Sequence, residues 1–172
     1  MGETAIVVLV PEAEQAVGSL YRTHTRAGRE GMSPHVTLLI PFADSESLPL
    51  DEVRAVLGRF EQFDFQLTEL RRFEPRSGPP ILWLEPDPAA SFVTLTEALV
   101  QAFPDYVPYG GAFAEIVPHL TVADARDERT PARIQRDVVP ALPIAARADA
   151  VTIVQRVDGR WQPHTRIPLG VS

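Results

Sequence analysis

Apolar and polar residues in the first quarter of the chain follow patterns that predict a strand, a helix and a second strand. Residues 4–10 form a continuous β-branched run, which is typical of a strand buried on both faces. Pro11 then stands where a first helical residue is tolerated, and apolar residues recur at helical spacing as far as Tyr21. The polar, glycine-rich residues 27–33 predict a loop, and residues 35–42 predict the next strand.

The same order of elements returns later in the chain. A helix opening at Pro49 and an alternating strand over residues 63–73 complete a first unit. The second unit is predicted to hold strands and helices over residues 81–84, 87–99, 116–123, 130–138, 148–157 and 160–168. An Asp-Gly pair at residues 158–159 predicts a tight hairpin between the last two strands. Both units read strand, helix, strand, helix, strand, which indicates an internal duplication.

The chain length fits one domain with its own core, because 172 residues are too few to expect two domains. No linker or block of charge divides the chain. We therefore predict a single α+β domain over residues 1–172, made of two similar lobes. Their boundary is not sharp and falls near residues 75–85.

Composition excludes several classes of chemistry. The chain has no cysteine, so disulfides, thiol catalysis and cysteine-ligated zinc are excluded. A net charge of −7 argues against a broad nucleic-acid-binding surface, although a small phosphate site remains compatible with it. We interpret two basic runs as solvated faces; they comprise Arg22, Arg26, Arg29, Arg71, Arg72 and Arg76.

Membrane association is not expected from the sequence. No apolar stretch approaches the roughly 18 residues that a spanning helix needs. The first residues lead directly into an apolar strand and do not resemble a secretory signal. We predict a cytoplasmic monomer.

Two histidines share a local pattern. Residues 34–38 (PHVTL) and residues 118–122 (PHLTV) both read Pro-His-apolar-Thr-apolar. Residues two apart on a strand point to the same face, so His35 projects with Thr37 and the intervening residue points into the core. The same spacing holds for His119 and Thr121. Two such strands side by side would present two imidazoles and two hydroxyls to one groove.

This set of groups suits phosphoryl chemistry at a ribose. A neutral imidazole can take a proton from water or a hydroxyl, and an imidazolium can protonate the leaving oxygen. The two threonine hydroxyls can donate to the non-bridging oxygens, where negative charge accumulates. No metal or other cofactor is required for these steps. A pair of modestly shifted imidazoles predicts a bell-shaped rate–pH profile with a maximum at roughly pH 6–8.

The same residues also have less specific interpretations. A single strand histidine is usually a hydrogen-bonded structural residue, but no packing requirement explains the same pair twice. A two-histidine metal site lacks a third ligand in register, because Asp44 and Asp124 follow their histidines at unequal distances.

Aromatic residues near the motifs are further candidates for the site. Phe42, Tyr109 and Phe113 could contact a base or line the groove, since aromatic rings stack on unpaired bases. For Phe42 a place in the core is an equal alternative. Trp83 and Trp161 stand in apolar strand contexts, so we expect them in the core.

The two motifs resemble the paired HxTx signatures of the 2H phosphoesterase superfamily, which includes bacterial 2′-5′ RNA ligases and cyclic phosphodiesterases. The resemblance covers essentially the whole chain and is carried by residues 34–42, 109–113 and 117–123. It implies two pseudo-symmetric lobes with antiparallel sheets around a central groove. It also implies hydrolysis of a 2′,3′-cyclic phosphate to a monoester.

Three functions follow as hypotheses. The first is a metal-independent phosphodiesterase that acts on a ribose 2′,3′-cyclic phosphate or a 2′-5′ linkage of nucleotides or RNA ends. Its catalytic residues would be His35 and His119, and Thr37 and Thr121 would bind phosphate. The alternative is a nucleotide-binding module of the same fold without significant turnover. The third is a partner-binding domain in which the motifs have no chemical role.

Overall fold

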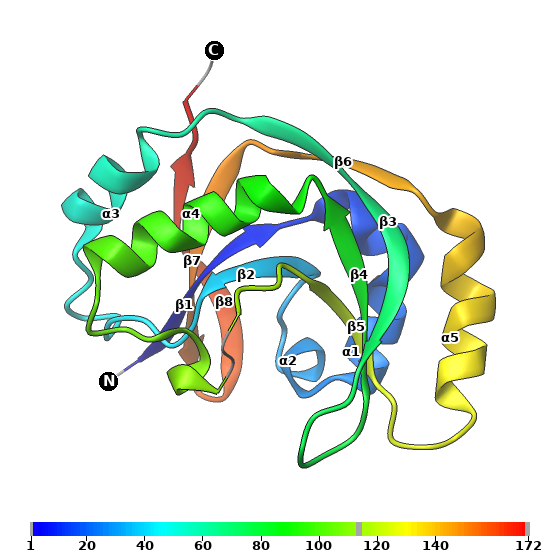
Figure 1. The fold of residues 1–172 in the computed structure, drawn as a ribbon. Helices are drawn as coiled ribbons and strands as arrows, with labels where there is room; N and C mark the ends of the chain where they lie inside the picture. Colours follow the sequence, from blue (N-terminus) through cyan, green and yellow to red (C-terminus); the bar gives the residue numbers. More distant parts are fainter. Residues whose placement is uncertain (1, 113–114, 171–172) are drawn as a thin grey trace.

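A single eight-stranded sheet organises the computed structural model, which describes residues 2–112 and 115–170 (Figure 1). The strand order is β6-β3-β4-β5-β2-β1-β7-β8, and each neighbouring pair is antiparallel. The strands are β1 (Glu3–Leu9), β2 (His35–Leu39), β3 (Phe63–Phe73), β4 (Ile81–Asp87), β5 (Leu120–Asp124), β6 (Ile144–Ala148), β7 (Ala150–Val157) and β8 (Arg160–Pro168). The predicted α+β domain with antiparallel strands is confirmed, and one curled sheet replaces the separate sheets that we expected.

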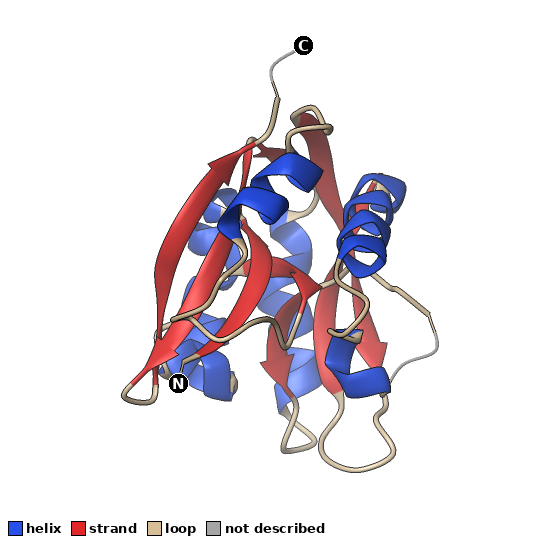
Figure 2. Ribbon diagram, turned by 90° about the vertical axis from the view of Figure 1, so that its left-hand side faces the viewer, coloured by secondary structure: helices blue, strands red, loops and turns tan. Residues whose placement is uncertain are grey.

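Helices flank the strands on more than one side (Figure 2). Their bounds are η1 (Pro11–Ala13), η2 (Glu14–Gly18), α1 (Ser19–His24), α2 (Arg26–Arg29), α3 (Leu50–Leu57), α4 (Ala89–Ala102), η3 (Pro108–Gly111), α5 (Thr130–Val138) and η4 (Val139–Ala141). The α4 helix contacts β2 and β4, and α1 contacts β5. The helix of each unit therefore packs against the motif strand of the other unit.

The two units of the sequence exchange strands in the sheet. β3 closes the first unit but pairs with β4 and β6 of the second. β7 belongs to the second unit but pairs with β1 of the first. One side of the sheet, β6-β3-β4-β5, therefore contains β3 from the first unit, and the other side, β2-β1-β7-β8, contains β7 and β8 from the second. The connection between β3 and β4, near the expected lobe boundary, joins two adjacent strands on the same side.

The core lies on both faces of the sheet. In β1, Ile6 and Val8 enter the larger apolar cluster, whereas Ala5 and Val7 enter a smaller one with Tyr21. This double burial is the physical reason for the continuous apolar run at the start of the chain. Each fully buried valine or isoleucine side chain among them stabilises the fold by about 1.5–3 kcal/mol.

Several predicted elements have the observed bounds, and several do not. The strand over residues 63–73, the helix over residues 130–138 and the closing hairpin are confirmed. Asp158 and Gly159 both have positive φ, 49° and 75°, as a type I′ turn requires. The predicted loop at residues 27–33 was wrong in part, because α2 covers its beginning, and the strand β6 was not predicted as a separate element. The first helix is divided into η1, η2 and α1.

Candidate active site

The two motif strands are neighbours at the centre of the sheet. β2 and β5 pair antiparallel, with Val36 opposite Leu120. In an antiparallel pair this register places His35 across from Thr121 and Thr37 across from His119. The two motifs are therefore related by an approximate twofold axis that passes between Val36 and Leu120.

Alternate residues of the two motif strands are buried in the core, whereas the histidines and threonines between them are partly exposed. Val36 and Leu120 are fully buried in the larger cluster, as are their neighbours two residues further along each strand. His35, Thr37, His119 and Thr121 are all partly exposed. We call the surface that carries these four side chains the motif face. The predicted strand from residue 116 was wrong in its start, because β5 begins at Leu120 and His119 immediately precedes it.

Each imidazole is oriented by a hydrogen bond to the backbone carbonyl two residues earlier. Nδ1 of His35 donates to the carbonyl oxygen of Ser33 at 2.8 Å, and Nδ1 of His119 donates to that of Val117 at 2.7 Å. A carbonyl oxygen can only accept, so Nδ1 must carry the proton in both rings. The lone pair of each neutral ring is then on Nε2. Nε2 is thus the atom that can take or give a proton to a substrate.

An aromatic ring contacts each imidazole edge-on. Tyr21 lies with its ring centroid 6.1 Å from that of His35, at an interplanar angle of 77°. Trp83 lies 5.9 Å from His119, at 71°. The expectation that Trp83 is only a core residue was wrong, because it stands opposite Thr121 on β4 and is partly exposed. Its apolar strand context gave no signal of this contact.

The surroundings of the motif face disfavour the charged form of both imidazoles. Loss of hydration lowers the pKa of His35 to about 4; the hydrogen bond to Ser33 acts against this, and the nearby His119 adds to it. Loss of hydration also lowers the pKa of His119, and the bond to Val117 opposes it. The expectation of only modest shifts was therefore wrong for His35. Both shifts favour the neutral imidazole in the unliganded protein.

The aromatic candidates have different locations. Tyr109 lies on the motif face: its ring stacks on His119 with centroids 6.2 Å apart at 27°, and its hydroxyl is hydrogen-bonded to Thr37. Phe42 is buried and packs against Phe103 and Tyr106, with centroid distances of 5.3 and 5.0 Å. Phe42 is therefore a core residue in this structure. Phe113 lies outside the described residues.

Most of the basic residues that we interpreted as solvated are paired with acids. Arg26 bonds Glu30 at 2.8 Å, and Arg22 lies 2.5 Å from Glu14. On the other side of the sheet, Arg71 pairs with Glu85 at 2.6 Å and Arg72 with Glu74 at 2.6 Å, and both arginines remain about half exposed. This arrangement fits solvated faces, because neighbouring carboxylates offset the charge of these four arginines.

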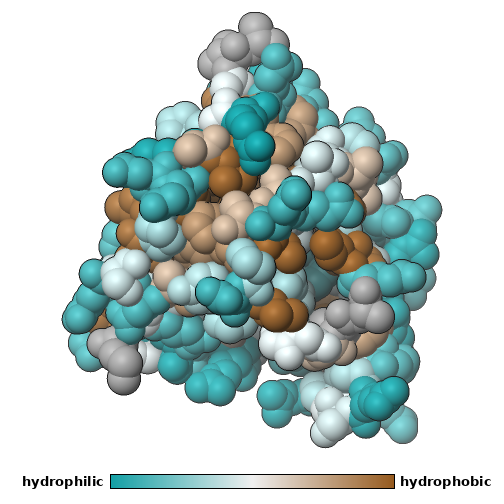
Figure 3. All heavy atoms as spheres, turned by 60° about the vertical axis from the view of Figure 1, so that its left-hand side comes forward, coloured by the Kyte–Doolittle hydropathy of each residue, from teal (hydrophilic) through white to brown (hydrophobic). Residues whose placement is uncertain are grey.

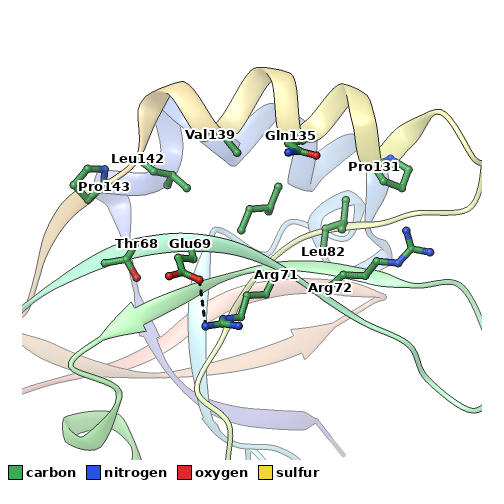
Figure 4. Close-up of a pocket in the computed structure, with 11 residues that line it drawn as sticks. Thr68, Glu69, Arg71, Arg72, Leu82, Pro131, Gln135, Val139, Leu142 and Pro143 are labelled. Atoms are coloured by element: carbon green, nitrogen blue, oxygen red, sulfur yellow. Dashed lines mark ion pairs between the residues drawn. The ribbon is translucent and has the colours of Figure 1, made fainter.

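Two cavities lie away from the motif face. One of about 560 Å³ is formed between β3, β4 and α5, with Thr68, Leu82 and Gln135 in its lining (Figure 4). Another of about 530 Å³ lies near Glu12 and Asp64. Neither cavity is lined by a motif residue.

The segment before the second motif exposes apolar side chains. Val107, Ile116 and Val117 are 51%, 37% and 49% exposed. Figure 3 shows one face of the molecule, on which separate apolar patches lie among polar side chains. Across residues 2–112 and 115–170 there is no group of three or more potential metal-ligating side chains. Among the helices in those residues, none is long and apolar enough to cross a membrane.

Solved structures share this fold at low sequence identity. Escherichia coli LigT complexed with 3′-AMP is 19% identical with a TM-score of 0.60, covering 98% of both chains. TT0787 of Thermus thermophilus is 18% identical with a TM-score of 0.61, covering 99% of both chains. E. coli LigT complexed with NADP+ is 18% identical with a TM-score of 0.58, covering 98% of both. These likenesses show that the chain shares the fold of LigT and TT0787.

The sequence itself also matches a family. A search of curated proteins gives no match, but a family model described as the 2′-5′ RNA ligase superfamily matches residues 9–160. The chain therefore belongs to the 2′-5′ RNA ligase superfamily of 2H phosphoesterases. The resemblance drawn from the two motifs is confirmed.

Proposed function

We propose that this chain is a metal-independent phosphodiesterase that acts on a ribose 2′,3′-cyclic phosphate or a 2′-5′ linkage of nucleotides or RNA ends. One observation carries the proposal: two imidazoles with the same tautomer stand beside two threonines on the central strands. Each Nδ1 is held by a carbonyl oxygen, which leaves both Nε2 atoms for proton transfer.

The reaction follows from these groups. For a cyclic phosphate, one imidazole takes a proton from water as the water oxygen forms a bond to phosphorus. The bond from phosphorus to one ribose oxygen breaks, and the other histidine, as imidazolium, gives that oxygen its proton. The Thr37 and Thr121 hydroxyls donate to the non-bridging oxygens as negative charge grows there. One water is consumed, and the product is a nucleoside monophosphate.

The comparisons support a ribose phosphate as ligand. LigT was crystallised with 3′-AMP and with NADP+. A 3′-monophosphate is the compound that forms when a 2′,3′-cyclic phosphate opens at its 2′ oxygen, and NADP+ carries a 2′-phosphate. Both ligands therefore present a phosphate on a ribose hydroxyl, as the proposed substrates do.

The test is incubation of the purified chain with 2′,3′-cyclic nucleotides and 2′-5′ dinucleotides, followed by chromatography of the products. We expect a monophosphate product from at least one substrate, and none from a His35→Ala, His119→Ala double variant prepared in parallel. Product formed equally by the double variant would come from a contaminant and would contradict the proposal.

A nucleotide-binding module without significant turnover is the second candidate. It is favoured by the lowered pKa of both imidazoles, because the unliganded protein at pH 7 then holds little of the charged acid. Tight binding of a cyclic nucleotide without product would support this candidate. Neither binding nor product would favour a partner-binding role.

We further propose that the chain acts as a cytoplasmic monomer on small nucleotides or RNA ends. The net charge of −7 and the paired arginines argue against broad contact with nucleic acid. Light scattering coupled to size-exclusion chromatography would test the monomer, and fractionation of cells would test the location.

A further inference from the structure

Trp83 on β4 lies in the same row of side chains as two motif residues. Along β4 the residues with odd numbers are partly exposed from Ile81 to Glu85, and those between them are buried. Trp83 pairs with Thr121 of β5, which lies across from His35 of β2. Directly paired residues of antiparallel strands project to the same face. Trp83 therefore borders the motif face, one strand beyond the second motif.

The indole of Trp83 contacts the second motif histidine. Its ring centroid lies 5.9 Å from that of His119, and the two rings meet at 71°. An imidazole covers at most one face of an indole, and Trp83 remains partly exposed. A second flat ring can therefore pack on Trp83 while the contact with His119 is kept.

The motif face is covered on the side of β1. Val7 of β1 pairs with Thr37, so its side chain points to the same face. Val7 is fully buried there in the smaller apolar cluster, whose other members include Tyr21, Met32 and Trp161. A ligand held between the motifs is therefore bounded on this side by packed side chains.

The opposite side of the motif face, over β4 and β3, is open. Trp83 and Glu85 are partly exposed, and Arg71, which pairs with Trp83 from β3, is about half exposed. Nε of Arg71 lies 2.6 Å from Oε2 of Glu85, and a second guanidinium nitrogen lies 3.2 Å from Glu69. Figure 4 shows Arg71 and Glu69 below the strands, with α5 above them. One aromatic ring thus lies between the imidazoles and a rim of ion pairs.

We propose that Trp83 is the nucleobase subsite of this protein: the base of a bound nucleotide stacks on its indole while the phosphate lies between His35 and His119. Every base has a flat π face, and unpaired bases stack on aromatic side chains. Neighbouring strands are about 4.8 Å apart, and the ribose separates base from phosphate by a similar length. This inference rests on the proposed function. The sequence had indicated other aromatic residues for such a contact and a place in the core for Trp83.

Fluorescence can observe this contact directly, because the chain has two tryptophans. In a Trp161→Phe variant the only indole is that of Trp83, and 3′-AMP stacked on it should quench its emission in a saturable titration. The reciprocal Trp83→Phe variant emits from Trp161 alone, which is 9% exposed in the smaller cluster. It should show no saturable quench. Binding of 3′-AMP by calorimetry without a quench of Trp83 would overturn the inference.

The effect of the phosphate has to be separated from that of the base. A bound phosphate favours the charged form of His119, and a charged imidazole beside an indole also quenches its emission. Titration of the Trp161→Phe variant with inorganic phosphate measures this effect without a base. We expect the larger quench at saturation from 3′-AMP. Equal quenches from the two ligands would contradict stacking on Trp83.

Two substitutions of Trp83 separate stacking from apolar bulk. Trp83→Phe keeps an aromatic ring, whereas Trp83→Leu keeps only bulk. Loss of a base–aromatic stack corresponds to roughly a 5- to 150-fold loss of affinity. We expect a loss of this order for 3′-AMP in Trp83→Leu, a smaller loss in Trp83→Phe, and unchanged affinity for inorganic phosphate in both. Equal 3′-AMP affinities in the two variants would overturn the inference. Thermal melting shows whether both fold, and the Trp161→Phe titration needs no change at Trp83.

Turnover distinguishes failure of the inference from failure of the proposed function. A stack away from the reacting bond should mainly lower KM, so Trp83→Leu should raise KM for a 2′,3′-cyclic nucleotide with little change in kcat. A lower kcat with unchanged KM and unchanged 3′-AMP affinity would limit Trp83 to positioning His119 and would overturn the base contact alone. If the wild type turns over nothing, the proposed function fails, and the 3′-AMP titrations still test the subsite. No binding of 3′-AMP to the wild type would overturn the subsite as well.

Discussion

His35 and His119 make the same kinds of contact, but the segments around them differ. Both rings donate from Nδ1 to the carbonyl two residues earlier, both meet an aromatic ring edge-on, and both precede a threonine by two residues. His35, however, begins a strand that pairs along its length with β1, whereas His119 immediately precedes β5, after a segment with exposed apolar residues. Tyr109 stacks on His119 alone.

The difference bears on the proposed roles of base and acid. The singly protonated pair is best populated when the base has a lower pKa than the acid, and identical surroundings would give both rings the same pKa. The stronger fall in pKa belongs to His35, the more enclosed ring, and the ring face of Tyr109 lies beside His119. A negative phosphate between the rings would raise the pKa of both. Ligand binding can therefore create the charged acid that the unliganded protein lacks at pH 7.

The largest expected effect comes from removing either imidazole. His35→Ala and His119→Ala should each lower turnover by roughly 10²–10⁴-fold, the usual scale for losing a general acid or base. The double variant should be little worse than the poorer single variant, because the two groups act as a unit. Steady-state kinetics on the best cyclic nucleotide measures this.

The control for the histidines is His164→Ala on β8. Its Nδ1 is hydrogen-bonded to the neighbouring Thr165 hydroxyl at 2.7 Å, so this ring belongs to a different strand environment. This variant should keep wild-type activity. A motif variant with a near-normal rate would show that its histidine takes no part in the proposed proton transfer.

The pH dependence of kcat/KM should reflect the lowered pKa values of the two imidazoles. A base must be deprotonated and an acid protonated, so the profile of kcat/KM for the free protein is bell-shaped. The pKa of both imidazoles is lowered, to about 4 for His35, so both limbs of the coupled pair should lie below the ordinary imidazole pKa of about 6.5. We therefore expect the maximum of kcat/KM between about pH 4 and 6.5.

The profile of kcat reports the complex and should be displaced to higher pH. Bound phosphate favours the charged imidazole and so raises the pKa values that set both limbs. The limbs of both profiles report macroscopic pKa values of the coupled pair, so neither limb is assigned to a single histidine. Coincident profiles of kcat and kcat/KM, or a rate that rises steadily to pH 9, would contradict the linked acid–base pair.

The threonines should have a smaller and unequal effect. Thr37→Val and Thr121→Val each remove one donor to the phosphate and should lower kcat on the order of 10- to 100-fold. Thr37→Val should cost more, since it also removes the partner of the Tyr109 hydroxyl. Thr94→Val in α4 is the control, because its hydroxyl bonds within the helix to Ala90. Equal losses at the two motif threonines would argue that Tyr109 contributes nothing to the site.

The elements that follow from local sequence patterns could be predicted. An approximate alternation predicted β3, a β-branched run predicted β1, and an Asp-Gly pair predicted the last hairpin. The spacing of His and Thr was sufficient to put them on one partly exposed face. These features depend on neighbours in the chain, so local periodicity records them.

Features that depend on distant partners could not be predicted. The exchange of β3 and β7 between the two units is a choice of pairing, and a repeated pattern is compatible with either pairing. The apolar residues Ile116 and Val117 suggested a strand, yet pairing with β4 begins only at Leu120. The place of Tyr109 depends on a loop that docks its backbone on Ile40. The depressed pKa of His35 likewise arises from burial, which no local spacing encodes.

The smallest expected effect is that of metal removal, which tests whether the two imidazoles act as an acid–base pair. If a metal ion bridged the two Nε2 atoms, the motifs would be ligands, and their unequal proton affinities would have no catalytic meaning. The described residues hold no group of three potential ligands, and an imidazole pair alone is a poor site for Zn²⁺. We expect dialysis against EDTA to leave kcat unchanged, with elemental analysis recording the metal content before and after. The matched arm adds Zn²⁺ or Mn²⁺ back to the dialysed protein and should give no increase. Loss of activity with the metal and its return at one ion per chain would replace the acid–base pair with a metal-bound hydroxide, for which the rate would keep rising with pH.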